Sequence, residues 1–145
     1  MRLFLLLSFI FAALSIPAVG GEGAGSTDFL EDIRPILAGK CFPCHGPDKA
    51  KRKGKLRLDT SAGIFSRGSS GSAVVAPGKA GESLLIEKIE STDEEEIMPP
   101  KDSGLELAPA EVSILRAWVN SGAEWKGHWA YRNPVRPSLP QVKDA

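Results

Sequence analysis

The sequence predicts one small all-α domain, on three observations. Its 145 residues and 42% apolar content suit a single packed unit with terminal extensions. Apolar residues recur at helical spacing in separate segments along the chain. Leu56 and Leu58 alternate with charged residues, which allows one short extended piece beside the helices.

The first predicted helix covers residues 28–39, and either Thr27 or Asp28 can cap its N-terminus. Its apolar face consists of Phe29, Ile33, Ile36 and Leu37. We expect this helix to run directly into the cysteine-containing stretch that follows. A weaker helical turn is predicted at 60–66, with Asp59 or Thr60 as its cap.

A Gly- and Ser-rich segment at 68–81 predicts a long loop in the middle of the domain. A short helix at 84–90 follows, and we expect Ser83 to cap it. Its predicted inward-facing residues are Leu84, Leu85 and Ile89.

The last predicted helix begins at Pro109, which suits a first-turn position, and ends within 120–122. Its apolar face consists of Val112, Ile114, Leu115, Trp118 and Val119. We interpret Trp118 as a core residue that packs on the Phe29/Ile33 face of the first helix.

The chain termini have a different character from the domain. Residues 1–20 combine Arg2, a short apolar run and small residues before position 21, which is typical of a secretory signal peptide. We therefore expect an exported, periplasmic or extracytoplasmic protein, with membrane contact only if that segment is retained as an anchor. Residues 28–125 form the predicted domain, and residues 126–145 form a Pro-rich extension or linker.

Charge and cysteine content exclude some classes of function. Lys plus Arg and Asp plus Glu number 18 each, so no overall charge favours nucleic-acid binding. The two cysteines are too few and too close together for a disulfide framework. The basic loop at 49–57 is either a solvated face or a docking patch for an acidic redox partner.

Both cysteines lie in the stretch Cys41-Phe42-Pro43-Cys44-His45. This spacing places two thiols on one turn of chain, so that each can add to one vinyl group of a single porphyrin. The adjacent His45 can then reach the iron. In an exported protein, the pattern predicts one covalently bound haem c with His45 as proximal ligand.

Three other uses of the motif stay open at this point. Zinc could use both cysteines with His45 and His128, although Cys44 and His45 are adjacent and rarely point at one tetrahedral ion. A thioredoxin-like redox pair would need a βαβ setting, whereas the flanks here indicate helix. The third alternative is a chance motif with a local disulfide.

Met98 is the predicted second iron ligand. It is the only methionine beyond the signal segment, it lies in a loop between helices, and Pro99 and Pro100 stiffen the backbone behind it. His128 is the alternative ligand. Lys55, Arg57 and Ser72 are candidates for contact with the haem propionates, although their spacing alone does not assign them.

Several motifs together resemble the planctomycete-type cytochrome c domain, over about residues 29–129. They are the Cys41–His45 motif, Gly54-Lys55-Leu56-Arg57-Leu58-Asp59, Gly71-Ser72-Ala73-Val74-Val75-Ala76-Pro77-Gly78, Ser83-Leu84-Leu85, Met98-Pro99-Pro100 and Leu115-Arg116-Ala117-Trp118-Val119-Asn120-Ser121-Gly122-Ala123. The resemblance implies a class I cytochrome c-like fold with three to five helices around one haem. It also implies that such a domain is joined to further exported domains in longer proteins.

The preferred interpretation is an electron carrier that cycles Fe(III)/Fe(II) with His45 and Met98 as axial ligands and has no catalytic residue. Its partner would be a redox protein or an attached downstream domain, and the chain could form part of a larger redox enzyme. Two alternatives are a haem enzyme or sensor with a displaceable Met98, and a structural haem module.

Overall fold

The computed structural model describes residues 27–127, and within this range the protein is helical. The elements are η1 (Phe29–Ile33), α1 (Arg34–Lys40), α2 (Phe42–His45), α3 (Ser61–Ile64), η2 (Ala80–Glu82), α4 (Leu84–Ile89), η3 (Lys101–Ser103) and α5 (Pro109–Asn120). An isolated bridge between Arg67 and Ala73 is the extent of β pairing in that part of the chain. The predicted all-α class is therefore confirmed.

Some predictions fall on other parts of the chain. The signal segment 1–20, His128 and nearly all of the extension 126–145 lie outside the described residues. Across 27–127, no helix has both the length and the apolar character needed to cross a bilayer.

The first predicted helix exists as η1 followed directly by α1. Asp28 caps it, because its Oδ1 accepts hydrogen bonds from the backbone N–H groups of Leu30 (2.8 Å) and Glu31 (3.3 Å). The helix opens with a wider π turn. The Cys41 N–H donates to the Leu37 carbonyl at 2.9 Å, so the helical path continues into the cysteine motif as expected.

The hydrophobic core joins the two ends of the domain. Trp118 of α5 is 1% exposed, and its ring centroid lies 5.8 Å from that of Phe29 in η1. Trp125 also packs on Phe29, and the centroids of these two rings are 4.3 Å apart. The Trp118 indole N–H donates to the Glu124 carbonyl at 3.0 Å, which satisfies its one polar atom. The core assignment of Trp118 and its pairing with the first helix are confirmed.

The expected cap of α4 is wrong in its detail. Ser83 precedes the helix, but its hydroxyl bonds the preceding loop instead of the helix: it accepts from the Ala76 N–H and donates to the Lys79 carbonyl, both at 2.9 Å. The Ser83 hydroxyl thus satisfies backbone groups of the preceding loop and is not available to cap α4. Buried Val74 and Val75 anchor the same loop.

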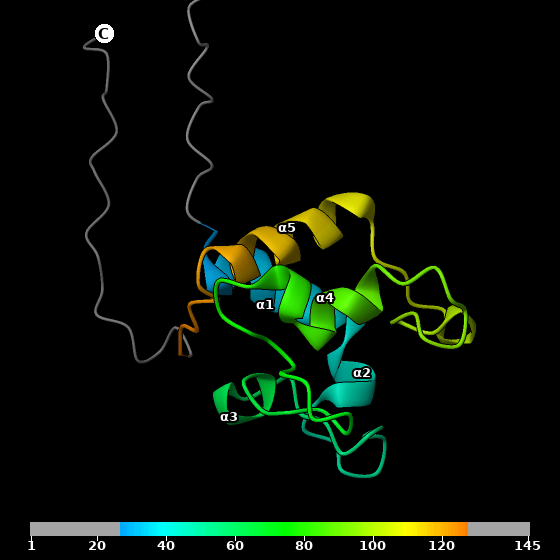
Figure 1. Cartoon of the computed structure of the whole chain (residues 1–145). Helices are drawn as coiled ribbons and strands as arrows, with labels where there is room; N and C mark the ends of the chain where they lie inside the picture. The colour runs from blue at the N-terminus through cyan, green and yellow to red at the C-terminus, as the bar shows by residue number, and fades with distance from the viewer. Residues whose placement is uncertain (1–26, 128–145) are drawn as a thin grey trace, which may run out of the picture.

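The inward face of α4 also differs by one residue. Leu85, Ile86 and Ile89 are buried, whereas Leu84 is half-buried. Figure 1 shows α4 lying beside α1 and α5, with α2 and α3 on the other side of the domain. Leu84 faces the space between these two groups of helices, where the pocket described below lies.

Candidate cofactor pocket

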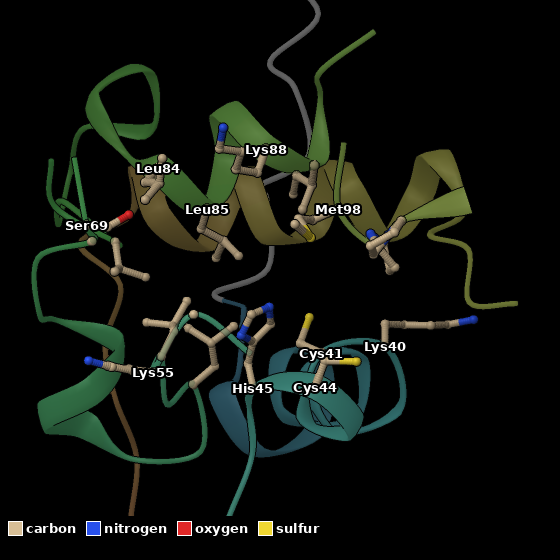
Figure 2. Close-up of a pocket in the computed structure, with 18 of the residues that line it drawn as sticks. Lys40, Cys41, Cys44, His45, Lys55, Ser69, Leu84, Leu85, Lys88 and Met98 are labelled. Carbon is tan, nitrogen blue, oxygen red and sulfur yellow. The ribbon is translucent and has the colours of Figure 1, made fainter. Parts of the chain in front are cut away.

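The structure brings all four predicted site residues to one pocket of about 440 Å³. This volume lies within the range of roughly 300–1,000 Å³ that is typical of small-molecule sites. Cys41, Cys44 and His45 approach from the wall formed by α1 and α2, and Met98 approaches from the opposite wall beside α4 (Figure 2). His45 and Met98 therefore face the same cavity from two sides.

The cysteine motif has a helical conformation that follows from its local hydrogen bonds. The His45 N–H donates to the Cys41 carbonyl at 2.8 Å, which closes one turn of α2. Positions i and i+3 share a helix face, so both thiols lie along the same side of the pocket. Cys41 and Cys44 are free thiols. Burial raises the pKa of Cys41 to about 12, and the negative charge of Glu111 adds to the rise, so this thiol is protonated at neutral pH.

The basic loop after the motif folds back onto α2. The Lys53 N–H donates to the Cys44 carbonyl and the Leu58 N–H donates to the His45 carbonyl, each at 2.8 Å. These bonds take the place of the short extended piece expected around Leu56, because the backbone pairs with a helix end instead of a strand. They also fix the backbone that carries His45.

The His45 side chain is suited to bind a metal. Its pKa lies below the usual value, because burial disfavours the charged imidazolium, and the nearby Lys53 backbone opposes this only in part. The ring is neutral at pH 7, which is the form that ligates metals. Nδ1 is buried and has no hydrogen-bond partner of good geometry among residues 27–127.

Met98 is held by the end of α4. Its N–H donates to the Lys88 carbonyl at 3.0 Å, and the Lys88 ammonium pairs with Glu87 and Glu96. The sulfur points into the cavity (Figure 2). Pro99 and Pro100 continue the same wall of the pocket.

The remaining lining matches an iron porphyrin, which is a flat apolar ring with two carboxylates. Its apolar residues are Leu56, Leu58, Val74, Leu84, Leu85, Ile89, Leu105, Pro99 and Pro100. Its cations are Lys40, Lys55, Arg67 and Lys88, and no Asp or Glu is among the described lining residues. Apolar walls with positive charge at the rim suit such a ring. The residues present therefore fit haem.

The structure separates the three residues considered for the propionates. Lys55 lines the pocket, whereas Arg57 and Ser72 are not among its lining residues. The Arg57 guanidinium pairs with Asp59, with Nε 3.0 Å from Oδ1. Sequence reasoning missed Lys40 and Arg67. Lys40 directly precedes Cys41 but belongs to no motif, and Arg67 reaches the pocket only through the folding of a loop distant in sequence.

The zinc alternative used His128, which lies outside the described range. Within residues 27–127, no group of three or more His, Cys, Asp and Glu residues is arranged to hold a metal ion.

Comparison with known proteins finds a similarity at the level of a family. A family model described as Planctomycete cytochrome C matches residues 41–102, a span that starts at the first cysteine and includes Met98. No curated protein and no solved structure matches the chain. The family match confirms the resemblance drawn from the sequence motifs.

Proposed function

We propose that the chain transfers single electrons through one covalently bound haem c, with His45 and Met98 as its iron ligands; residues 41–102 match the family model described as Planctomycete cytochrome C. The family indicates a haem-binding, electron-transfer domain. The observation that carries the ligand assignment is the pocket with His45 and Met98 on facing walls and two thiols beside them.

When bound, haem c supplies an iron that exchanges one electron between Fe(III) and Fe(II). Cys41 and Cys44 hold the group through two thioether bonds. The neutral His45 imidazole and the Met98 thioether would bind the iron from the two facing walls, and a thioether ligand favours Fe(II) and a positive potential. The apolar walls keep water away from these ligands.

The proposed location is outside the cytoplasm, on the basis of the secretory pattern in residues 1–20. The proposed partner is an acidic redox protein or an attached downstream domain. Residues 40–67 hold eight Lys or Arg and two Asp or Glu, whereas residues 82–111 hold ten Asp or Glu and two Lys or Arg. A partner with negative charge is therefore attracted to the loop beside the cysteines.

The covalent link is tested with a Cys41→Ala, Cys44→Ala double variant of the exported protein. We expect the wild type to keep its haem through acid–acetone extraction, because thioether bonds survive that treatment. The double variant should release all of its haem or contain none. Haem that stays with the double variant would contradict the assignment of these cysteines.

The axial ligands are tested with visible spectra of the holoprotein. We expect low-spin spectra in both oxidation states of the wild type. Met98→Ala should give a high-spin haem that binds external ligands and has a lower midpoint potential. His128→Ala should leave the spectrum unchanged. A Met98→Ala spectrum identical to wild type would move the sixth ligand to His128. Ready binding of peroxide or gases by the wild type would instead favour an enzyme or sensor.

A further inference from the structure

Positive charge is distributed unevenly around the pocket. Lys40 lies on the side of the cysteines, whereas Lys55 and Ser69 lie on the other side of His45 (Figure 2). Arg67 belongs to the same loop as Ser69 and also lines the pocket. The side of the pocket away from the cysteines thus combines two cations with a hydroxyl.

These two cations have no carboxylate partner in the described part of the chain. Lys88, by contrast, is already paired with Glu87 and Glu96. Arg67 donates from Nη1 to the Gly71 carbonyl at 2.7 Å, which leaves its other N–H groups for a ligand. Lys55 and Arg67 are therefore charges without a carboxylate partner at one end of a mainly apolar cavity.

Lys55 has a left-handed backbone conformation, which is unusual for a lysine. Gly54 and Lys55 have φ values of +57° and +55°, and the Leu56 N–H donates to the Lys53 carbonyl at 3.2 Å. Such a turn favours Gly or Asn at its central positions, since other residues are strained there. A strained lysine at the rim of a pocket indicates a role for its side chain.

The loop that carries Arg67 is held against α4. Within the loop, the Gly68 N–H donates to the Ser72 carbonyl and the Gly71 N–H donates to the Gly68 carbonyl, each at 2.9 Å. Gly68 lies so close to α4 that a Cβ there would come within 2.5 Å of Leu84 Cδ2. The loop backbone is thus positioned before any ligand binds.

We propose that Lys55 and Arg67, assisted by Ser69, form a carboxylate-binding end of the pocket that holds the haem propionates. The proposal rests on the haem c function above. A porphyrin of this type carries its vinyl groups and its propionates on opposite edges, so attachment at Cys41 and Cys44 directs the carboxylates away from the cysteines. A guanidinium and an ammonium at that end provide charge-assisted hydrogen bonds.

The test uses the holoprotein with Lys55→Asn and Arg67→Gln. Asn removes the charge and still adopts the left-handed backbone at position 55. Lys51→Asn is the matched control, because Lys51 is an exposed cation of the same loop that does not line the pocket. The readouts are the propionate bending mode in the resonance Raman spectrum and the midpoint potential.

We expect the propionate mode to shift to lower frequency and the potential to fall in both pocket variants. Arg67→Lys should restore part of each shift, and Lys51→Asn should match wild type. If Arg67→Gln does not fold, Lys55→Asn alone decides. A wild-type propionate mode in the folded pocket variants would overturn the proposal while leaving the haem c function intact, whereas a wild type without covalent haem would overturn both.

Discussion

At the scale of single residues, Asp28 combines two roles at the start of the domain. Its carboxylate caps η1 and also accepts from the Lys126 ammonium at 2.8 Å. Its pKa is lowered chiefly by the hydrogen bond from Lys126, with backbone N–H groups adding to the effect. Because the carboxylate is favoured in the folded state, it contributes stability above its unfolded pKa and loses it as pH falls through the folded pKa.

We predict that Asp28→Ala lowers the free energy of unfolding by about 1–2 kcal/mol at pH 7, because a helix cap and an ion pair are both lost. The difference from wild type should shrink as the pH falls below the ordinary Asp value of 3.8. Denaturant unfolding across pH 2–7 measures it. Asp28→Asn keeps a cap acceptor without charge and should fall between the two. A difference that is constant with pH would contradict the role of the charge.

Which residues could be predicted depends on whether their signal is local. Asp28 and Thr60 were among the predicted caps, and both accept from backbone N–H groups one turn away. Met98 could be found because it is rare and followed by prolines. Lys55 was one of several candidates, and Arg67 had no signal, because its role depends on which loops fold together.

At the scale of elements, two glycines have opposite environments. Gly39 is exposed on α1, and a Cβ there would meet no atom within 4 Å. A Cβ on Gly63 of α3 would lie 1.9 Å from the Arg57 carbonyl oxygen, which belongs to the backbone and cannot move aside alone. Glycine at position 39 thus weakens α1, whereas glycine at position 63 is required for α3 to pack.

We predict that Gly39→Ala raises the free energy of unfolding by about 0.5–1 kcal/mol, because alanine restricts the unfolded chain and favours helix. Gly63→Ala should lower it by about 1–3 kcal/mol, because the added methyl forces α3 away from residue 57. Thermal unfolding of the two variants under one condition compares them directly. Destabilisation of similar size in both would show that the environment of Gly63 is not special.

Helices were easier to predict than the segments between them. The helix over 109–120 follows from its apolar spacing and first-turn proline, and the structure has it from Pro109 to Asn120. The loop before α4 was predicted as a loop, but its internal bonds were not. Hydrogen bonds such as that from Ala76 to Ser83 depend on tertiary approach, which hydrophobic periodicity does not encode.

At the scale of the whole molecule, opposite charges are separated along the chain. The basic loop after α2 and the acidic loop after α4 project from different parts of the domain in Figure 1. Equal totals of 18 positive and 18 negative residues conceal this separation. The net charge therefore predicts little about association, while the local charge predicts which redox reagents approach the pocket.

We predict that ferricyanide oxidises the reduced holoprotein at a rate that falls as ionic strength rises, because screening weakens attraction between the anion and the basic loop. Charge reversal with Lys51→Glu and Lys53→Glu should slow the reaction about tenfold at low salt and much less at about 0.15 M, where the Debye length is about 8 Å. Stopped-flow absorbance measures the rates. Lys79→Glu, at the residue just before η2, is the control, and an equal effect there would argue against a localised docking region.

The ion pair between Asp28 and Lys126 has a mechanical consequence. Residues separated by almost the whole domain in sequence meet at 2.8 Å, and Phe29 and Trp125 pack beside them. Entry and exit of the described chain therefore share one corner, at the left of Figure 1, while α2 and its cysteines lie elsewhere. A force that pulls the two ends apart is borne first by this ion pair and aromatic contact. These contacts must therefore break before the tension reaches the pocket.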